Sequence, residues 1–442
     1  MSKSAIVIGA GLAGLSAGFR LKQAGFDVTV LEQRDRVGGR VLTIRRDGFV
    51  IDSGPDAMTE SYKNYQALAT ELGYGDQFVH SSAVVGLLRD GRVLDIDTKS
   101  LLSMVFTPTL SWSAKIRFAW GLFKNRKLFV GVDSFRLVDS ADFDTDKEHA
   151  ETFSLREFGR EITDYVIDPL IRLVAGGSAD EASRLGVLGG MVNWSVPLMN
   201  IKGGLDMLPM ALAKHVNIKT SVEVSKLVDT GQGVEVSYSD AKGETQLLQA
   251  DVCVIATPHN VSEAIYPKLR ELVPGYSDKI KYIKLVSLSL AYAAPTNSKA
   301  YVVQVPTVES RDVLLIFMQH NKASDRAPPG KSLITIYTDT MAWERIALQD
   351  DETVTKWARG EIEKMFPELG GHFIFGSISR WPFTGYLADP GFWLRTRELM
   401  KAQPETSRIQ LAGDLFGAGS MESAVTWGEH AARCLIAHHS VV

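Results

Sequence analysis

The first 32 residues alternate between apolar runs and one stretch with helical spacing. Residues 4–9 form a continuous apolar run that ends in glycine, which is typical of a buried parallel strand. Residues 13–24 repeat apolar positions at helical spacing, and Gly25 is placed to stop the helix. Residues 27–32 form a second strand-like run. This order predicts a right-handed βαβ unit.

The next part of the chain changes its pattern. A helix is predicted at residues 62–73, and a hairpin at residues 84–97 around Arg89-Asp-Gly-Arg92. Residues 101–216 carry mostly helical signals. Within them, Ser154-Leu-Arg-Glu157 has the spacing of a capping box, and Asp168-Pro169 predicts the start or kink of another helix.

A strand-rich block follows, and the end of the chain returns to alternating elements. Strands are predicted at residues 222–228, 233–238, 245–248, 250–258, 281–292, 313–318, 332–338 and 408–412. A loop at residues 413–419 then leads into a helix at residues 421–437, with Ser420 as its N-cap. The pattern predicts an α/β fold with an α+β second domain, assembled from separated segments.

Bulk properties narrow the class of protein. The chain has 442 residues, of which 45% are hydrophobic and 23% charged, as in ordinary globular proteins, and its length favours two connected domains. A net charge of −4 gives no reason to expect nucleic acid as a partner. Cys253 and Cys434 have no metal-like spacing, so we predict neither a disulfide framework nor a metal site. We found no signal peptide and no apolar run of about 20 residues, so we expect a cytoplasmic protein.

The turn Gly9-Ala10-Gly11-Leu12-Ala13-Gly14 lies between the first predicted strand and helix, and Glu32 ends the next strand. Gly9 permits the tight turn, Gly11 lets the backbone approach a pyrophosphate, and Gly14 lets the helix pack on the strand. The helix N-terminus offers unpaired N–H groups to phosphates. Glu32 can accept hydrogen bonds from the ribose hydroxyls. This context predicts a Rossmann-like dinucleotide site, with contacts at Gly9, Gly11, Leu12, Ala13, Gly14, Glu32 and Gln33.

The segment that follows Glu32 distinguishes between FAD and NAD as the bound dinucleotide. Gly38 and Gly39 let the main chain pass close to a bulky ligand. Arg40 then offers a forked cation to phosphate oxygens. We interpret Gly38-Gly39-Arg40 as evidence for FAD.

These residues resemble the flavin-containing amine oxidase and protoporphyrinogen oxidase superfamily, and the likeness extends over essentially the whole chain. The resemblance implies a Rossmann-like FAD-binding domain of the amine-oxidase type with an inserted substrate domain of mixed sheet and helices. It assigns residues 1–82, 203–275 and 400–442 to the FAD domain, and residues 83–202 and 276–399, mainly helical near 101–200, to the substrate domain. Further FAD contacts are implied at Gly54, Pro55, Asp56, Val224, Thr257, Gly413, Asp414 and Met421. No cysteine precedes Gly413 closely enough to tether the flavin, so the FAD is expected to be non-covalent.

Departures from the family pattern indicate which branch of the superfamily the chain resembles. Amine oxidases of this superfamily carry a lysine near flavin N5, where our alignment places Ser287, with Lys284 one turn of register away. They also carry a tyrosine just before the C-terminal helix, where this chain has Ser420. Both differences favour the protoporphyrinogen-oxidase-like branch. Substrate contacts are predicted at Met58, Trp381, Phe383, Tyr386 and Phe416, and Asp56 is a candidate general base.

The predicted function is dehydrogenation of a bulky, largely apolar cyclic substrate by hydride transfer to flavin N5, with oxygen or another acceptor reoxidising the flavin. Three alternatives remain open: an amine oxidase with an altered aromatic cage, an isoprenoid or alicyclic desaturase, and a non-redox FAD isomerase or binding protein. The apolar and basic segment at residues 102–130 is either a substrate-domain helix or a surface for peripheral membrane contact. The oligomeric state is open, with a dimer as one candidate.

Overall fold

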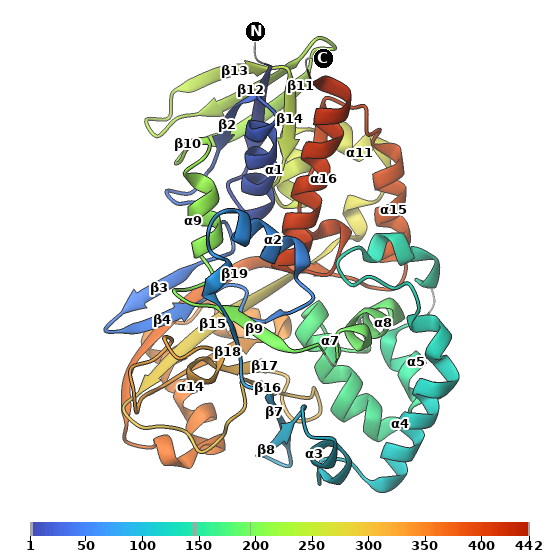
Figure 1. The fold of residues 1–442 in the computed structure, drawn as a ribbon, viewed down its shortest axis with the longest axis vertical. Helices are drawn as coiled ribbons and strands as arrows, with labels where there is room; N and C mark the ends of the chain where they lie inside the picture. The colour runs from blue at the N-terminus through green and yellow to red at the C-terminus, as the bar shows by residue number, and fades with distance from the viewer. Residues whose placement is uncertain (1–2, 145–147, 195, 441–442) are drawn as a thin grey trace.

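A computed structural model describes residues 3–144, 148–194 and 196–440. The molecule is elongated, and both ends of the chain lie at the same end of it (Figure 1). That end contains a parallel five-stranded sheet in the order β10 (Asn217–Lys219), β2 (Asp27–Leu31), β1 (Ser4–Ile8), β14 (Val252–Ile255) and β20 (Ile409–Leu411). The first βαβ unit is therefore confirmed, with its two strands paired side by side.

Two helices from opposite ends of the sequence pack together beside this sheet: α1 (Leu12–Gln23) and α16 (Met421–His439) (Figure 1). Their approach is close, because a Cβ on Gly428 would lie 2.3 Å from the Ala13 carbonyl oxygen. An antiparallel sheet of β11 (Glu223–Asp229), β12 (Val234–Ser239) and β13 (Thr245–Ala250) continues this half of the molecule.

The other half contains a mixed seven-stranded sheet. Its order is β19 (Phe373–Leu387), β15 (Lys281–Tyr292), β18 (Ser332–Thr338), β17 (Val313–Met318), β16 (Val302–Gln304), β7 (Val84–Arg89) and β8 (Arg92–Asp97). Only β16 and β7 pair in parallel within the described sheet. One face is covered by α14 (Asp351–Met365), whose Val354, Ala358 and Ile362 join a core with the sheet.

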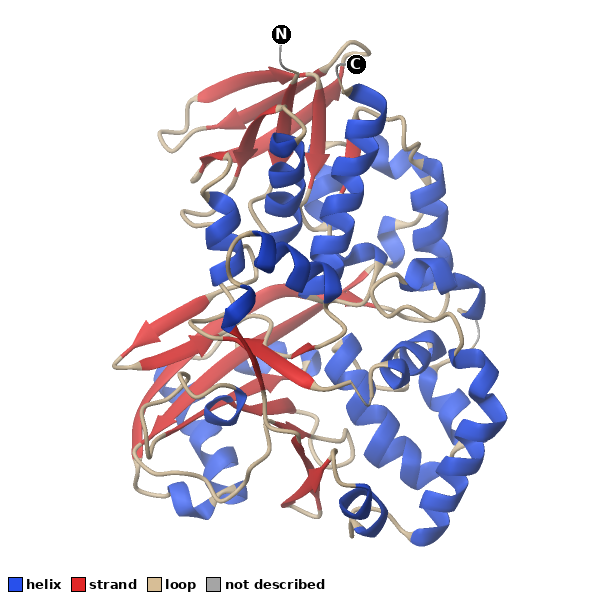
Figure 2. Cartoon of the chain, in the orientation of Figure 1, coloured by secondary structure: helices blue, strands red, loops and turns tan. Residues whose placement is uncertain are grey.

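Most of the helices before residue 195 gather in a lobe beside this sheet (Figure 2). They are α3 (Leu101–Phe106), α4 (Trp112–Asn125), α5 (Ala150–Glu157), α6 (Arg160–Ile162), α7 (Asp168–Ala175) and α8 (Arg184–Val192), with a π-helical turn at Thr163–Ile167. The smaller connecting strands are β3 (Thr43–Arg46), β4 (Phe49–Asp52), β5 (Met58–Thr59), β6 (Phe78–His80) and β9 (Leu198–Ile201). The remaining α-helices are α2 (Lys63–Glu71), α9 (Met207–Ala213), α10 (His259–Ile265), α11 (Lys268–Leu272), α12 (Gln319–Lys322), α13 (Trp343–Ile346) and α15 (Phe392–Ala402).

The predicted capping box is wrong. Ser154 lies inside α5, which begins at Ala150, and its hydroxyl donates to the Glu151 carbonyl, so it caps nothing. By contrast, Asp168 does begin α7, with Pro169 in the first turn. Strand β9 interrupts the stretch that we predicted to be mostly helical, because it pairs with β5 and β6, which lie far away in sequence. The α/β class with a mixed second sheet is confirmed, and the assignment of residues to two domains stays a prediction.

Candidate active site

One cavity of about 1200 Å³ extends between the carboxyl ends of the parallel strands and the helical lobe. This volume exceeds the usual range of about 300–1000 Å³ for a small-molecule pocket, so it has room for a cofactor and a second molecule. Glycine turns and strand ends form one part of its wall, which we call the cofactor end. Side chains of the helical lobe form the other part, which we call the helical end.

The first glycine turn forms part of the cofactor end as predicted. Gly9 has a φ of +101°, and a Cβ there would lie 2.8 Å from the Ala256 carbonyl oxygen. Gly11 is the N-cap of α1 and provides no side-chain hydrogen bond, so the N–H groups of the first turn face the cavity without a cap. Gly14 lies off the cavity, and a Cβ there would collide with the Gly9 carbonyl at 2.0 Å. Its role is helix–strand packing.

The second glycine pair lies against the first turn. Gly38 pairs with Gly11 in an isolated parallel bridge, and the Gly38 N–H donates to the Ala10 carbonyl at 2.9 Å. A Cβ on Gly39 would lie 3.0 Å from the Cα of Gly11. The pair therefore allows two backbone segments to approach each other beneath the cavity, besides leaving space for a ligand.

Glu32 lies at the end of β2 and is almost fully buried. Its Oε2 accepts from the Ala10 N–H at 2.7 Å and its Oε1 from the Arg34 N–H at 2.9 Å. These bonds fix the carboxylate while leaving lone pairs directed at the cavity, which Gln33 and Val224 also line. The arrangement suits recognition of vicinal hydroxyls.

Arg40 and Asp414, which the sequence offered as separate contacts, form a pair. The guanidinium donates to both carboxylate oxygens of Asp414, at 2.7 and 2.8 Å, and stacks 4.9 Å from the Phe383 ring centroid. Asp414 is buried, and the Arg40 side chain is 30% exposed. This bidentate pair brings residues 374 positions apart to one wall.

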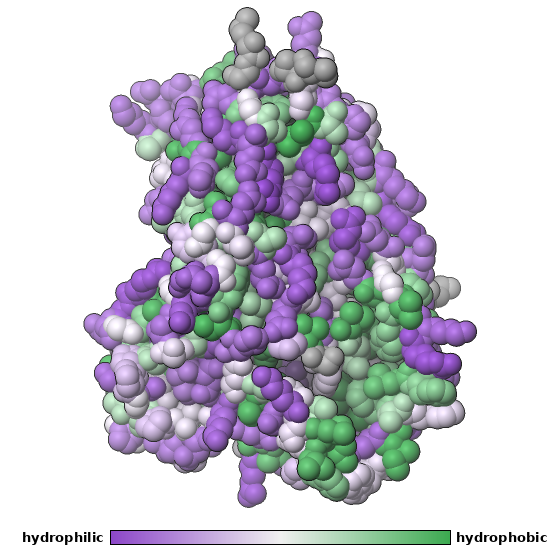
Figure 3. All heavy atoms as spheres, viewed as in Figure 1, coloured by the Kyte–Doolittle hydropathy of each residue, from purple (hydrophilic) through white to green (hydrophobic). Residues whose placement is uncertain are grey.

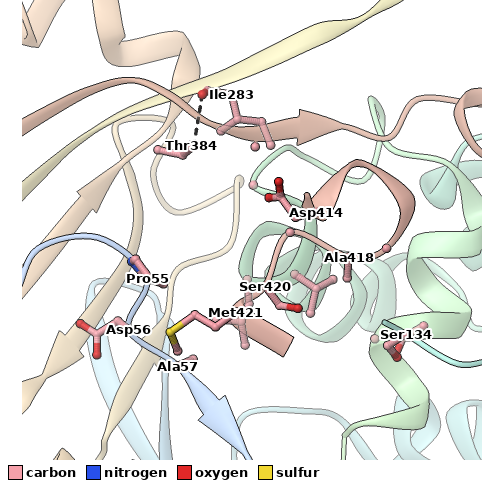
Figure 4. A pocket seen from close by; sticks show the side chains of 18 of the residues that line it. Pro55, Asp56, Ala57, Ser134, Ile283, Thr384, Asp414, Ala418, Ser420 and Met421 are labelled. Atoms are coloured by element: carbon pink, nitrogen blue, oxygen red, sulfur yellow. Dashed lines mark hydrogen bonds between the residues drawn. The ribbon is translucent and has the colours of Figure 1, made fainter. Parts of the chain in front are cut away.

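The segment after β4 is locked in place from behind. A Cβ on Gly54 would lie 1.9 Å from the Arg40 carbonyl oxygen, so only glycine fits. Pro55 and Asp56 also line the cavity (Figure 4). The Asp56 carboxylate, however, is bound by Lys322 Nζ at 2.6 Å and by the amide of Gln319. The Tyr337 hydroxyl, which does line the cavity, donates to the same carboxylate at 3.4 Å, and the role of Asp56 as a candidate base stays a prediction.

Behind Asp56 lies a cluster of four buried ions that sequence reasoning missed: Asp52, Asp56, Lys322 and Arg326. Lys322 Nζ also lies 2.7 Å from Asp52, and Arg326 lies 3.3 Å from the same carboxylate. Burial opposes ionisation of Asp52, but the two cations hold its pKa down to about 2. Burial and the neighbouring Asp52 charge raise the pKa of Asp56 despite Lys322. The stretch around Lys322 carries no motif, so no sequence signal indicated this cluster.

Histidine and tyrosine side chains near the loop after β14 are buried at the same end. Burial lowers the pKa of His259 to about 4, although Glu263 opposes the shift. The backbone N–H of His259 donates to the Tyr386 hydroxyl at 3.0 Å, and burial raises the pKa of Tyr386 well above its usual value. Both groups are neutral near pH 7. Thr257 and Gly413 line the cavity nearby.

Helix α16 begins at the cavity, as predicted. Ser420 is its N-cap and accepts from the Ser423 N–H, and Met421 lines the cavity (Figure 4). The positive end of the helix dipole thus faces the site.

Four of the five predicted substrate residues line the cavity: Trp381, Phe383, Tyr386 and Phe416. Met58 does not; it is fully buried in the core around the parallel sheet.

Ser287, which our alignment placed near flavin N5, is buried, and its hydroxyl has no partner among the described residues. Lys284, in contrast, is partly exposed and lies 3.8 Å from Glu344. Lys284 is not among the residues that line the cavity.

The helical end was not predicted residue by residue. Its lining comes from helices far apart in sequence and includes Leu110, Trp112, Ile116, Phe118, Leu122, Leu137, Leu170, Met191 and Trp194. Their apolar spacing is indistinguishable from that of ordinary core-facing positions, so the sequence held no local signal for them.

The fold and the site together define an FAD-dependent oxidoreductase. The uncapped start of α1, the fixed Glu32 and the glycines that leave no room for a Cβ fit the ADP part of FAD, and the α16 N-terminus fits the electron-rich edge of its ring. The family model described as flavin containing amine oxidoreductase matches residues 12–436. The chain belongs to that family, and FAD is its cofactor.

Individual relatives add detail. Mitochondrial protoporphyrinogen oxidase of Nicotiana tabacum is 32% identical over 186 residues, which are 41% of this chain and 34% of that protein, so the match spans about a third of the plant relative. Coproporphyrinogen III oxidase of Bacillus subtilis is 21% identical over 90% of both chains. The structure of cyclohexylamine oxidase from Brevibacterium oxydans has a TM-score of 0.76 at 17% identity and 99% coverage of both chains, which shows the shared fold.

Proposed function

We propose that the protein dehydrogenates a bulky, largely apolar cyclic compound of the porphyrinogen type. The observation that carries this proposal is the continuity of the cavity from the glycine turns into the wide, apolar helical end. A small amine would leave most of that apolar wall in contact with water. The names of the sequence relatives support the same substrate class.

FAD, when bound, supplies the chemistry by accepting a hydride equivalent from the substrate. The protein's own residues position the reactants. Trp381 is held by its indole N–H, which donates to the Ser53 carbonyl at 2.7 Å, and the Tyr386 hydroxyl is held by the backbone N–H of His259. These fixed aromatic groups present flat apolar faces to a substrate, and the apolar helical end excludes water around it.

An anaerobic titration tests this function. Purified holoprotein is mixed with a porphyrinogen, a cyclic amine or an isoprenoid, and the flavin absorbance is followed. Bleaching by the porphyrinogen with formation of the oxidised tetrapyrrole is expected. Bleaching only by the amine would instead establish an amine oxidase with an altered cage, and bleaching only by the isoprenoid would establish a desaturase. A flavin that no compound reduces would point to an isomerase or a binding protein.

We also propose that the helical end opens onto a membrane surface. No helix among the described residues is long and apolar enough to cross a membrane. Figure 3 shows apolar surface gathered over the lower right of the molecule, where Figure 1 has α3 and α4. Exposed large apolar side chains there are Leu101, Leu102, Met104, Phe106, Trp112, Ile116, Trp120, Phe123 and Val130, which we call the α3–α4 face.

This face is continuous with the cavity, because Leu101, Met104, Trp112 and Ile116 both belong to the face and line the cavity. Its cations are partly engaged within the protein: Lys124 pairs with Glu157 at 2.7 Å, and Lys115 donates to the Val105 and Thr107 carbonyls. Insertion of apolar side chains should therefore contribute more to binding than attraction to anionic lipids.

Vesicle sedimentation tests the surface. The holoprotein should bind zwitterionic and anionic phosphatidyl-lipid vesicles with similar affinity, and Ile116→Ser with Trp120→Ser should abolish binding. Leu348→Ser is the matched control, because Leu348 is at least as exposed as Ile116 and Trp120 but lies outside the face. Equal binding by both variants, or no binding by the wild type, would contradict the proposal.

A further inference from the structure

The C-terminal half of α16 carries a cluster of potential metal ligands that the proposed function does not use. His430 and Cys434 are four residues apart, so they lie on one face of the helix. Glu405, from the segment between α15 and β20, faces them. The ligating atoms of these three residues all lie within 4.8 Å of one another.

The distance between the ligand atoms of His430 and Cys434 matches that between two ligands of one tetrahedral metal ion. His430 Nε2 lies 3.6 Å from Cys434 Sγ. Zinc bonds of about 2.3 Å to sulfur and about 2.05 Å to nitrogen, at a tetrahedral angle, separate the two ligand atoms by about 3.5 Å. The two side chains thus already have the separation that one shared Zn²⁺ requires.

The cluster also lines a hollow. A cleft of about 330 Å³ is lined by Arg136, Glu405, His430, Arg433, Cys434, Ala437 and His438, none of which lines the large cavity. The Glu405 segment is held in place, because the Gln410 amide donates to the Glu405 carbonyl at 3.1 Å. Of the two arginines, Arg136 is paired with Asp139 at 2.7 Å and Arg433 is exposed. Both arginines line the same cleft, and the Glu405 carboxylate and a Cys434 thiolate supply the negative charge that a bound cation requires.

We propose that Glu405, His430 and Cys434 bind one divalent transition-metal cation of the Zn²⁺ class. Thiolate, imidazole and carboxylate together are typical ligands of zinc, and three protein ligands leave the fourth position to water. The ion would fasten α16 to the segment before β20. Since both elements belong to the half that contains the glycine turns, bound metal should stabilise that half without touching the large cavity.

Calorimetric titration of the holoprotein with Zn²⁺ tests the site. One equivalent should bind, and the melting temperature should rise to a plateau. Cys434→Ala and His430→Gln should each weaken binding by more than about 100-fold, the upper end of what losing a supporting hydrogen bond costs a metal site. Cys253→Ala is the matched control, because Cys253 is a buried thiol in β14, outside the cluster. It should bind Zn²⁺ as the wild type does.

Co²⁺ provides a second measurement that does not depend on enzyme activity. Tetrahedral Co²⁺ absorbs in the red, beyond oxidised flavin, and a thiolate–Co²⁺ charge-transfer band should be present in the wild type and absent in Cys434→Ala. The melting temperature of each metal-free variant checks that it folds. The proposal is overturned if no equivalent binds, if binding survives in Cys434→Ala, or if only His438→Gln and His439→Gln abolish it.

Discussion

Two regions that border the cavity depart from the usual distribution of side chains: one buries charged groups, and the other exposes apolar groups. Around Asp52 and Lys322, four charged groups are fully buried. On the α3–α4 face, aromatic and aliphatic side chains such as Ile116 and Trp120 are more than half exposed. Charged residues are almost never fully buried without partners, and large contiguous apolar patches are uncommon on monomers.

The two regions differ in how rigidly they hold the wall of the cavity. The buried ions lie behind the Gly54–Asp56 wall and satisfy one another, so this wall has one geometry. On the α3–α4 face the apolar groups are exposed beside the cavity, where Phe106 packs against Trp112 and Trp120 against Phe123. The first region therefore contributes rigidity, and its disruption should cost stability. Disruption of the second region should cost little stability and should instead affect how the substrate enters the cavity.

The largest effect is expected from Lys322→Met. Removing the cation leaves Asp52 and Asp56 without their shared partner, which should lower the free energy of unfolding by about 3–5 kcal/mol. Urea denaturation measures this loss. Lys356→Met, at an exposed position of α14, should change stability by less than about 0.5 kcal/mol. If Asp56→Asn does not recover part of the loss in the double variant, the two groups are not coupled.

A somewhat smaller effect should follow from His259 as the pH is lowered. Its pKa is about 4 in the folded chain against an ordinary value of 6.5, so the unfolded chain binds more protons between these values. Stability should therefore fall as the pH falls from 6.5 to 4, with a contribution from His259 of up to about 3 kcal/mol. His259→Gln should flatten the stability profile in this window. An unchanged slope would show that the ring is accessible to water.

Gly54→Ala should cost about 1–3 kcal/mol, because the added methyl group overlaps the Arg40 carbonyl and the wall must shift. The variant should also lose FAD on gel filtration, whereas the wild type retains it. The control is Gly360→Ala in α14, where nothing lies within 4 Å of the new Cβ. It should be stabilised slightly, since alanine is the better helix former. Full FAD retention by Gly54→Ala would mean that the wall is not rigid.

The smallest effect on stability is expected from a substitution on the α3–α4 face. Trp120→Ser on the α3–α4 face should change the free energy of unfolding by no more than about 0.5 kcal/mol, because the side chain is mostly exposed. A loss above about 2 kcal/mol in thermal or urea denaturation would show that the side chain packs within the protein. The comparison between the two regions would then fail.

Local sequence signals identified the cofactor end well, because its parts are short and contiguous. Gly9 to Gly14, Glu32 and Gly38 to Arg40 all occur within one βαβ unit and the segment after it. The pairing of Arg40 with Asp414, and the ion cluster around Lys322, join residues hundreds of positions apart, and no spacing rule encodes such contacts. Met58 illustrates the reverse error. A residue that is near the predicted flavin-contacting segment in sequence points into the core, because β5 pairs with β9.

The long strand β19 has a mechanical consequence. It runs for 15 residues, pairs along most of its length with β15, and ends beside the cavity with Trp381, Phe383 and Tyr386. The ladder is interrupted by register shifts between Ile283 and Leu285 and between Ala291 and Tyr292, and the first shift lies opposite residues 382–384, beside the cavity. Such an irregularity bends a strand locally and re-aims its side chains, so the direction in which Phe383 meets the cavity depends on the register of the ladder at this point.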